Sequence, residues 1–453
     1  MRLNVLLTAG LIARSIIASA APVAETTPLK LPAVERKALL NGMQFLFFDA
    51  ESEDCPFLLM IENGAAFDPV DKWGVTYLMS RMILEGVVER NLRQEFESRG
   101  IRIESQVDWD AFYFLGTAPA SQLEYALLAL GDLVVHPDFR EETFERLRRE
   151  LLAELNEEAA NIEARTEQVF QATVFADNPY GHSVRGEPRT VSNLYLRDIK
   201  IQQRRLLLPN QAKLAVYYSG DRELLFRRLS RRWGAWVRSE AAPFSFVQAE
   251  RSERPRIRVL ENQGSQGECL IRWGQLGVAK SAPEFFALKI LEQYLLLQLP
   301  EWAEQVSRAG QIRGEVVLAP RRMPGYFQVS LASPVGDVTA YLRQLNRVLA
   351  EVKSGRIDEA RFQEAKSLVK QEFLASMQDP FGRLMQVLAA ELHQLGANFV
   401  ATFNLRLDRV TPAHFQEVIR RAFPDQGAVV VVAAPAGPIV TDLQEFGDVE
   451  LLH

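Results

Sequence analysis

The sequence predicts an α+β fold of two homologous halves, each a mixed or antiparallel sheet with helices covering one face. Two observations lead to this prediction. Three segments of the first half have counterparts in the second half, in the same order along the chain. Each half also passes from strand-like to helix-like segments and back to strand-like segments, which is typical of a sheet covered by helices.

The three pairs of matching segments have nearly constant offsets. The stretch LLLPNQAKLAVYYSGD around Pro209 matches RAFPDQGAVVVVAAPAG around Pro424. FERLRRELLAEL matches FQEAKSLVKQEFLAS, which places Glu154 opposite Glu372. The helical stretch GVTYLMSRMIL, which begins at Gly74, matches ALKILEQYLLL. The offsets are 215, 218 and 213 residues, and three matches in one order indicate a duplication.

The chain divides into four predicted segments: a signal peptide (1–20), a first domain (21–240), a polar, proline-bearing linker (241–256) and a second domain (257–453). Arg2, the apolar run LNVLLTAGLIA and the small residues ASA at 18–20 are typical of a secretory signal. The run is shorter than the ~20 apolar residues that span a bilayer. We therefore expect a cleaved signal rather than an uncleaved anchor, and a soluble protein exported to the periplasm or the extracellular space.

The composition is that of an ordinary globular protein, with 453 residues of which 47% are hydrophobic and 24% charged. The formal charge of −6 argues against a nucleic-acid partner, which usually requires a basic face. Cys55 and Cys269 are the two cysteines, so there is no disulfide framework. They occupy similar positions in the two repeats, and such positions in separate domains are usually distant. We expect two thiols that are not linked to each other.

The helix predicted over 74–86 has one apolar face and carries no side chain capable of catalysis. Its apolar residues recur with the helical period and are Val75, Leu78, Met79, Met82 and Ile83. Gly86 follows as a cap. Further along, Ile101, Ile103, Ser105 and Val107 alternate with charged or amide side chains. This alternation predicts a strand with one buried and one polar face.

Seven motifs, in their order and spacing, resemble the pitrilysin/insulinase metallopeptidases, in particular the mitochondrial-processing-peptidase type. The motifs are NGMQFLFFDA, IENGAAFDPVDKWGVTYLMSRMILEG, RGIRIESQVDWDAFYF, LVVHPDF, LLAELNEEAANIEARTEQVF, NPYGHSVRG and LLLPNQAKLAVYYSGD. The resemblance covers nearly the whole mature chain. It implies that the two peptidase-like halves form half of a clamshell chamber around peptide.

Active members of the resembled family carry an inverted zinc motif, H-x-x-E-H, on this helix. Its two imidazoles bind Zn²⁺, its glutamate activates a water, and a glutamate from a later helix is the third protein ligand. The frame set by Gly74 and Gly86 places Thr76, Met79 and Ser80 at the His, Glu and His positions. A neutral hydroxyl is a poor zinc ligand, and a thioether cannot accept a proton from water. We therefore expect no catalytic residue and no metal in this chain.

No shift of the frame restores the zinc motif. The histidines are His136, His182, His393, His414 and His453, and no two of them are spaced i, i+4. All of them also follow the predicted helix, which ends near Gly86. We expect each to be a surface or packing residue.

Glu154, in the local motif LLAEL, matches the third ligand of the resembled family, and Glu157 is a nearby competitor. One carboxylate cannot hold zinc alone, so we expect Glu154 to be a solvated or salt-bridged helix residue. Active assemblies of the family also carry an Arg and a Tyr in a pattern like R-x-x-x-G-L-x-Y. Here VSRAGQIRGEV places Val306 and Arg313 at those positions. Arg308 would compensate only after a shift of the frame.

In the resembled family, the strand equivalent to 101–114 is a sheet edge that receives extended substrate through its backbone groups. This implies a substrate-binding role for Ser105, Gln106 and Val107. The alternative is an ordinary edge strand that is protected from pairing by its charged residues. Backbone pairing does not need the metal, so either role is compatible with a degenerate zinc site.

Three functions follow from these expectations. The favoured one is a non-catalytic, exported subunit that pairs with a zinc-bearing paralogue to enclose peptide substrate, zinc being expected only in that partner. The other pairing left open is that of two copies of this chain as a homodimer. The alternative is a stand-alone peptide-binding or scaffold protein of the same fold. An active zinc metalloendopeptidase is disfavoured because the histidines are missing.

Overall fold

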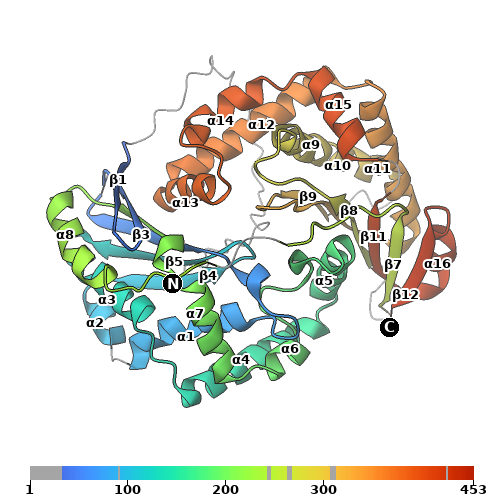
Figure 1. The fold of residues 1–453 in the computed structure, drawn as a ribbon. Coiled ribbons are helices and arrows are strands. Elements are labelled where there is room, and N and C mark those ends of the chain that lie inside the picture. The colour runs from blue at the N-terminus through green and yellow to red at the C-terminus, as the bar shows by residue number, and fades with distance from the viewer. Residues whose placement is uncertain are drawn as a thin grey trace.

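The computed structural model describes residues 33–50, 52–89, 92–241, 246–262, 268–306, 313–424 and 427–452. Within these ranges the chain forms two six-stranded sheets and the helices that pack on them (Figure 1). The predicted signal peptide (1–20) lies outside the described residues, as does part of the predicted linker (241–256). The predicted domain boundaries therefore stay predictions.

The first sheet has the strand order β1-β2-β6-β3-β5-β4. β2 and β6 run parallel, and every other neighbouring pair is antiparallel. The sheet is therefore mixed, and β4 is its edge. Its strands are β1 (Glu35–Ala38), β2 (Gln44–Phe48), β3 (Asp54–Glu62), β4 (Arg102–Val107), β5 (Ala111–Pro119) and β6 (Ala212–Tyr217).

The second sheet repeats this arrangement with the order β12-β7-β11-β8-β10-β9. Five strands have counterparts in the same order, so that β9 is the edge that corresponds to β4. The opposite edges differ, because β12 runs parallel to β7 whereas β1 runs antiparallel to β2. The strands are β7 (Arg256–Glu261), β8 (Glu268–Leu276), β9 (Arg313–Ala319), β10 (Tyr326–Pro334), β11 (Val429–Ala434) and β12 (Asp448–Leu452).

The helices of the two halves also correspond. Those of the first half are α1 (Val75–Glu89), α2 (Leu92–Ser98), α3 (Leu123–Val135), α4 (Glu141–Ala160), α5 (Ile162–Phe175), α6 (Pro188–Ser192), α7 (Leu196–Leu206) and α8 (Arg222–Trp233). Those of the second half are α9 (Phe285–Leu296), α10 (Leu299–Val306), α11 (Val338–Lys353), α12 (Glu359–Gln378), α13 (Pro380–Leu392), α14 (Phe399–Asp408), α15 (Pro412–Ala422) and α16 (Ala436–Leu443). None of these helices combines the length and apolar character needed to cross a bilayer.

The longest helix of each half ends at a residue that caps the next helix. α4 and α12 both contain 20 residues. The Asn161 side chain accepts hydrogen bonds from the first turn of α5, and the Asp379 side chain does the same for α13. An N-cap of this kind satisfies amide groups that the helix itself leaves unpaired. The matching caps support the duplication that the sequence predicts.

Each half also contributes one helix to the other half. α5 packs on β8 and β11 of the second sheet, while α13 packs on β3 and β6 of the first sheet. Figure 1 shows α5 beside the second sheet and α13 beside the first. Phe170 and Val174 of α5 share a core with Val429 and Val431 of β11. The second face of each sheet is therefore buried against a helix that the other half supplies.

The predicted fold class is confirmed: the chain is α+β, with two halves in a clamshell-like arrangement. The exchange of α5 and α13 adds a feature that the sequence did not predict. Cys55 and Cys269 lie at the starts of the corresponding strands β3 and β8; both are buried and neither forms a disulfide within the described part of the chain. The prediction of two unlinked thiols is thereby confirmed. Burial raises the pKa of the Cys55 thiol to about 11.

Candidate functional site

Helix α1 carries the three positions at which the resembled family has its zinc motif. It packs against α4, α7 and strand β4. The preceding Gly74 has a positive φ of 92°, and a Cβ atom there would lie 2.5 Å from the carbonyl oxygen of Arg185. Glycine is therefore required at the start of this helix. The backbone that would present a zinc motif is retained.

Thr76 is part of a buried polar network. Its hydroxyl donates to Oδ1 of Asp68 at 2.5 Å and accepts a hydrogen bond from Nε2 of Gln202 at 2.9 Å. The backbone amide of Gly74 donates to Oδ2 of Asp68 at 2.8 Å. Burial raises the pKa of Asp68 to about 7, while these hydrogen bonds act in the opposite direction. The side chain at the first ligand position thus has a structural role at the beginning of α1.

Met79 and Ser80 occupy the other two positions and are also committed to the interior. Met79 belongs to the apolar core of the first half. The hydroxyl of Ser80 is buried and donates to the carbonyl oxygen of Tyr77, one turn earlier in the helix, at 2.8 Å. Among the described residues, no group of three His, Cys, Asp or Glu side chains is placed to hold a metal ion.

Glu154 of α4 faces α1 and forms ion pairs with two arginines. Oε1 lies 3.3 Å from Arg81 of α1, and Oε2 pairs with Arg185. The same arginines bind Glu150 and Glu158, one turn to either side on α4. A positive charge therefore lies beside Glu154, as it would in a metal site, but two guanidinium groups supply it. The sequence predicted a solvated or salt-bridged residue, and the structure places Glu154 in ion pairs.

Strand β4 lies beside α1 and carries the three predicted substrate-binding residues, Ser105, Gln106 and Val107. The amide of Asp108 donates to the carbonyl of Ala111 on β5 at 2.9 Å. Alternate residues of an antiparallel strand bond to the same neighbour. Gln106 therefore turns its backbone toward β5, whereas Ser105 and Val107 turn their backbone groups to the open side. The structure brings this edge next to the degenerate zinc positions.

Comparison with known proteins shows a likeness to one peptidase family over part of the chain. The model of the insulinase family, peptidase family M16, matches residues 48–187, the segment that contains α1, β4 and α4. This chain carries an insulinase-type domain. Mitochondrial-processing peptidase subunit beta of Bos taurus is 21% identical over 174 residues, which are 38% of this chain and 36% of that protein. Cytochrome b-c1 complex subunit 1, mitochondrial, of Homo sapiens is 23% identical over 172 residues. The chain thus matches 36% of the length of each of these relatives.

Two solved structures share the fold of most of this chain. A peptidase M16 inactive domain from Pseudomonas fluorescens superposes with a TM-score of 0.79 and 18% identity, covering 89% of this chain and 98% of that one. A protease from Helicobacter pylori gives a TM-score of 0.78 and 16% identity, covering 90% and 100%. At sequence identities this low, the similarity to these two structures shows a shared fold and nothing more.

The second half of the chain has a charged cluster at the place that corresponds to Glu154 in the first half. The ammonium group of Lys289, on α9, forms ion pairs with Glu292 and, at 3.4 Å, with Glu372 on α12. Glu292 also accepts a hydrogen bond from the amide of Leu318 at 3.0 Å. The sequence comparison set Glu154 opposite Glu372 but did not identify Lys289 as its partner. The sequence signal that could have identified this partner is a Lys and a Glu, Lys289 and Glu292, spaced i, i+3 within an apolar helix.

The described positions of the family's Arg/Tyr pattern lie at the ends of two elements. Val306 is the last residue of α10, and Arg313 is the first residue of β9 and is exposed. Arg308 lies outside the described residues. The structure therefore gives no arrangement of these side chains that would bind a substrate carbonyl.

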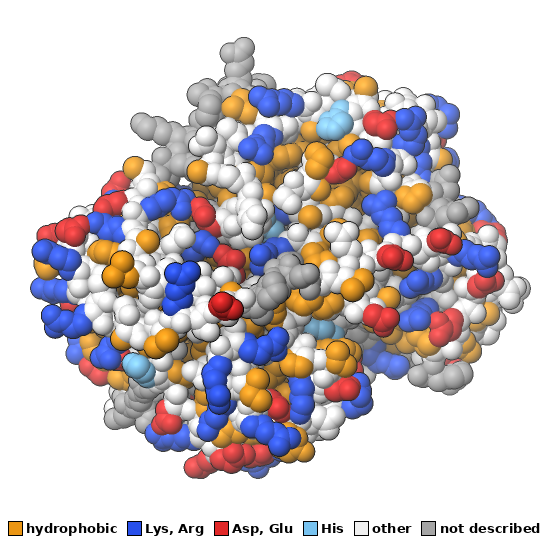
Figure 2. All heavy atoms as spheres, in the orientation of Figure 1, with side chains coloured by type: hydrophobic (Ala, Val, Ile, Leu, Met, Phe, Trp, Pro, Cys, Tyr) orange, Lys and Arg blue, Asp and Glu red, His pale blue; other side chains and the backbone are white. Residues whose placement is uncertain are grey.

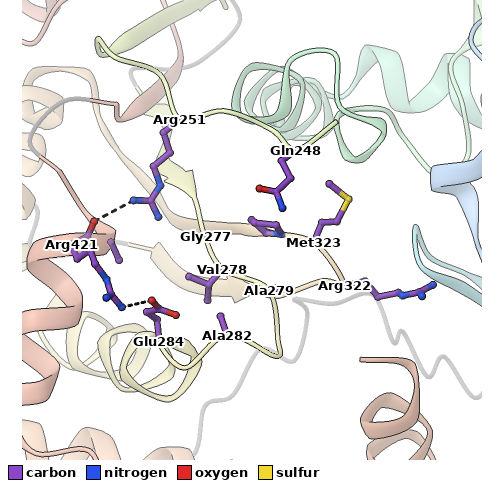
Figure 3. A pocket seen from close by; sticks show the side chains of 12 residues that line it. Gln248, Arg251, Gly277, Val278, Ala279, Ala282, Glu284, Arg322, Met323 and Arg421 are labelled. Carbon is purple, nitrogen blue, oxygen red and sulfur yellow. Dashed lines mark hydrogen bonds and ion pairs between the residues drawn. The ribbon is translucent and has the colours of Figure 1, made fainter. Parts of the chain in front are cut away.

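A cavity of about 340 Å³ lies where the segment that follows the first half meets the second half (Figure 3). Its polar lining includes Gln248, Arg251, Glu284 and Arg421. Arg251 donates to the carbonyl of Arg421 at 3.3 Å, and Arg421 pairs with Glu284. Figure 3 shows these groups directed toward one another across the cavity wall. Three of its charged groups therefore already bind one another, while a fourth, Arg322, donates to Asn63.

The tips of two hairpins join the halves at the centre of the molecule. The guanidinium of Arg321, in the β9–β10 loop, lies 3.4 Å from the ring centroid of Trp109 and 4.8 Å from that of Tyr180. Asp110, in the β4–β5 hairpin, accepts hydrogen bonds from the Tyr180 hydroxyl at 2.5 Å and from the amide of Arg322 at 2.9 Å. This junction fixes the end of β4 against the second half.

Proposed function

We propose that this chain is a non-catalytic subunit of an insulinase-type peptidase. It is exported, pairs with a zinc-bearing paralogue and helps to enclose a peptide substrate, while zinc and catalysis belong to the partner. One observation carries the proposal. The fold of the family is present across both halves, but Thr76, Met79 and Ser80 are bound into the interior by their own contacts.

The compared proteins support the pairing. Two of the relatives are named as subunits, one of a mitochondrial-processing peptidase and one of a cytochrome b-c1 complex. One structural neighbour is named an inactive domain. A chain that keeps the scaffold while its ligand positions are used for packing is suited to be the partner of an active subunit.

Co-expression with a paralogue from the same genome that carries H-x-x-E-H tests the proposal. We expect the two chains to copurify, with zinc at one ion per pair and chelator-sensitive cleavage of an unfolded peptide. Replacing the first histidine of the paralogue's motif is the control and should abolish cleavage without separating the chains. Cleavage by this chain alone, or an active paralogue that never associates with it, would contradict the proposal.

A second candidate is a stand-alone peptide-binding protein that uses the open edge of β4. The outward backbone groups of Ser105 and Val107 favour it, because such groups pair with an added strand and need no metal. Proline at Ser105 removes the outward N–H, and an edge strand tolerates the ring. We expect Ser105→Pro to abolish binding of unfolded peptides, whereas Ser105→Ala, which keeps the N–H, binds like the wild type.

Peptide titration with circular dichroism of each variant separates the outcomes. The matched change on the other edge is Val316→Pro in β9, which controls for a general effect of proline in a strand. Leu318 turns its amide away from β10, toward Glu292, and by alternation Val316 also turns its N–H away from β10. Equal binding by the wild type and Ser105→Pro would exclude the β4 edge as the binding site. A weak, nearly sequence-independent affinity that only Ser105→Pro removes would identify this edge.

A further inference from the structure

Two apolar side chains project into solvent at one place on the first half. Leu40, in the turn between β1 and β2, is fully exposed, and Val237, which follows α8, is 81% exposed. Hydrogen bonds hold their two segments together, because the Asn41 side chain donates to the carbonyl oxygens of Trp233 at 2.8 Å and Trp236 at 3.0 Å. Leu40 precedes one end of this bridge in the chain, and Val237 follows the other end. A single exposed apolar side chain is common, whereas two in joined segments form a candidate contact surface.

Basic side chains gather around the same place, because helices α7 and α8 both end there. The indole N–H of Trp236, shortly after α8, donates at 3.0 Å to the carbonyl oxygen of Leu207, the residue that follows α7. Five exposed arginines lie in the last turns of the two helices and in the loop after α8, and they are Arg204, Arg205, Arg231, Arg232 and Arg238. Figure 2 shows Lys and Arg side chains gathered over the edge of the molecule at which Figure 1 places α8.

Most of this positive charge is not neutralised by the chain itself. The segment 196–238 contains eleven Lys and Arg residues and three Asp and Glu residues, although the whole chain has a formal net charge of −6. Of the five arginines, Arg232 pairs with Asp132 at 2.8 Å. The other four form no ion pair within the described part of the chain, and Glu240 adds one negative charge beyond Arg238. Unpaired guanidinium groups on one face attract an anionic partner.

The combination of projecting apolar side chains and a basic surrounding favours a bilayer as that partner. Side chains as exposed as Leu40 and Val237 enclose nothing, whereas a free phosphate or a small ligand needs a site that surrounds it. A bilayer takes up projecting apolar side chains below its headgroups, and anionic headgroups bind Lys and Arg side chains at the same depth. The long apolar stem of an arginine lets its guanidinium reach the phosphates while the neighbouring apolar side chain is inserted.

We propose that Leu40, Val237 and the surrounding arginines form a docking surface for an anionic phospholipid bilayer. The surface belongs to the first half of this chain alone, so the inference does not depend on the proposed pairing with a paralogue. It goes beyond the proposed function by placing the exported chain against a membrane. The other occupant, an acidic protein surface, is an outcome of the test below.

Vesicle flotation of the full mature chain tests the role of the charges. Vesicles of phosphatidylcholine alone are compared with vesicles of phosphatidylcholine and phosphatidylglycerol in equal parts. We expect binding to the anionic vesicles only, and weaker binding as NaCl is raised, because salt screens the attraction. One basic residue near an anionic surface changes the affinity roughly fivefold. The double variant Arg204→Gln/Arg231→Gln should therefore weaken binding by roughly twentyfold to thirtyfold.

A second pair of variants tests the role of the apolar side chains. Leu40→Ser/Val237→Ser removes the groups that enter the bilayer and should weaken binding by about tenfold or more. Arg347→Gln changes an exposed arginine on α11, and Val70→Ser changes a valine that is 80% exposed in the loop before α1. These two matched controls should bind like the wild type. The substituted side chains are exposed, and circular dichroism checks that each variant is folded.

The outcomes separate this inference from the proposed function. Failure of the wild type to bind anionic vesicles overturns the inference, as does equal binding to neutral vesicles or wild-type binding by both double variants. Loss of copurification with the paralogue in the double variants, without vesicle binding by the wild type, would assign the surface to a protein partner and also overturn it. A paralogue that never associates with this chain would contradict the proposed function and leave vesicle binding unchanged.

Discussion

The long helices α4 and α12 occupy equivalent places in the two halves, but their matched glutamates lie in different surroundings. Glu154 pairs with Arg81 and Arg185 on the surface, and its side chain is 45% exposed. Glu372 pairs with Lys289, which also binds Glu292, and those two side chains are only 15% and 9% exposed. Glu372 itself is 52% exposed, so the two halves differ in what the cation binds besides the matched glutamate: Lys289 also pairs with the buried Glu292, whereas Arg81 and Arg185 pair only with partly exposed glutamates.

This difference determines how much each cluster contributes to stability. Exposed ion pairs contribute little, because solvent already stabilises the separated charges. A buried pair depends on its partner, because each charge alone is poorly solvated. The first half therefore tolerates changes around its former ligand position, while the second half does not. The predictions below are ordered from the largest effect to the smallest.

Replacing Lys289 with methionine should have the largest effect on stability. It leaves Glu292 buried without its cation, and breaking a buried pair in this way typically costs roughly 3–5 kcal/mol. Urea unfolding followed by fluorescence measures the free energy of unfolding. The double variant Lys289→Met/Glu292→Gln should recover most of the loss, because Gln keeps an acceptor for the Leu318 amide. A single variant as stable as the wild type would show that the cluster is dispensable.

Asp68 should make the stability depend on pH. Burial raises its pKa from 3.8 to about 7, so the folded chain keeps a proton that the unfolded chain has released. The contribution of Asp68 to stability is therefore largest below about pH 4, falls as pH rises from about 4 to about 7, and levels off above. The fall should be roughly 2–4 kcal/mol. Unfolding curves across this range should lose that slope in Asp68→Asn; an unchanged slope would assign it to other groups.

Neutralising Glu154 should change stability least. Its pairs with Arg81 and Arg185 are exposed, so Glu154→Gln should lower the free energy of unfolding by less than about 1 kcal/mol. Glu157→Gln, an exposed neighbour on the same helix, is the matched control. Thermal unfolding of both variants measures the difference. A loss of several kcal/mol for Glu154→Gln would contradict the prediction, because an exposed ion pair should not contribute so much to stability.

Much of the fold could be predicted because it follows from local patterns. The repeated segments predicted two related halves, and the alternation at 101–107 predicted the strand that forms the edge β4. The exchange of α5 and α13 could not be predicted in this way. A strand with both faces apolar shows that each face is covered, but not that Phe170 covers the sheet of the other half.

The candidate site could be predicted in part for the same reason. The identities of Thr76, Met79 and Ser80 exclude a zinc motif directly from the sequence. Their actual partners, such as Asp68 and Gln202 for Thr76, depend on tertiary packing.

Metal content tests the central claim most directly, namely that this chain keeps the insulinase-type fold without the zinc centre. The mature chain, purified alone and equilibrated with zinc before extensive dialysis, is analysed by inductively coupled plasma mass spectrometry and incubated with an unfolded peptide. We predict substoichiometric zinc and no cleavage, because Thr76, Met79 and Ser80 occupy the ligand positions. One tightly bound zinc per chain, together with cleavage that a chelator abolishes, would contradict the claim.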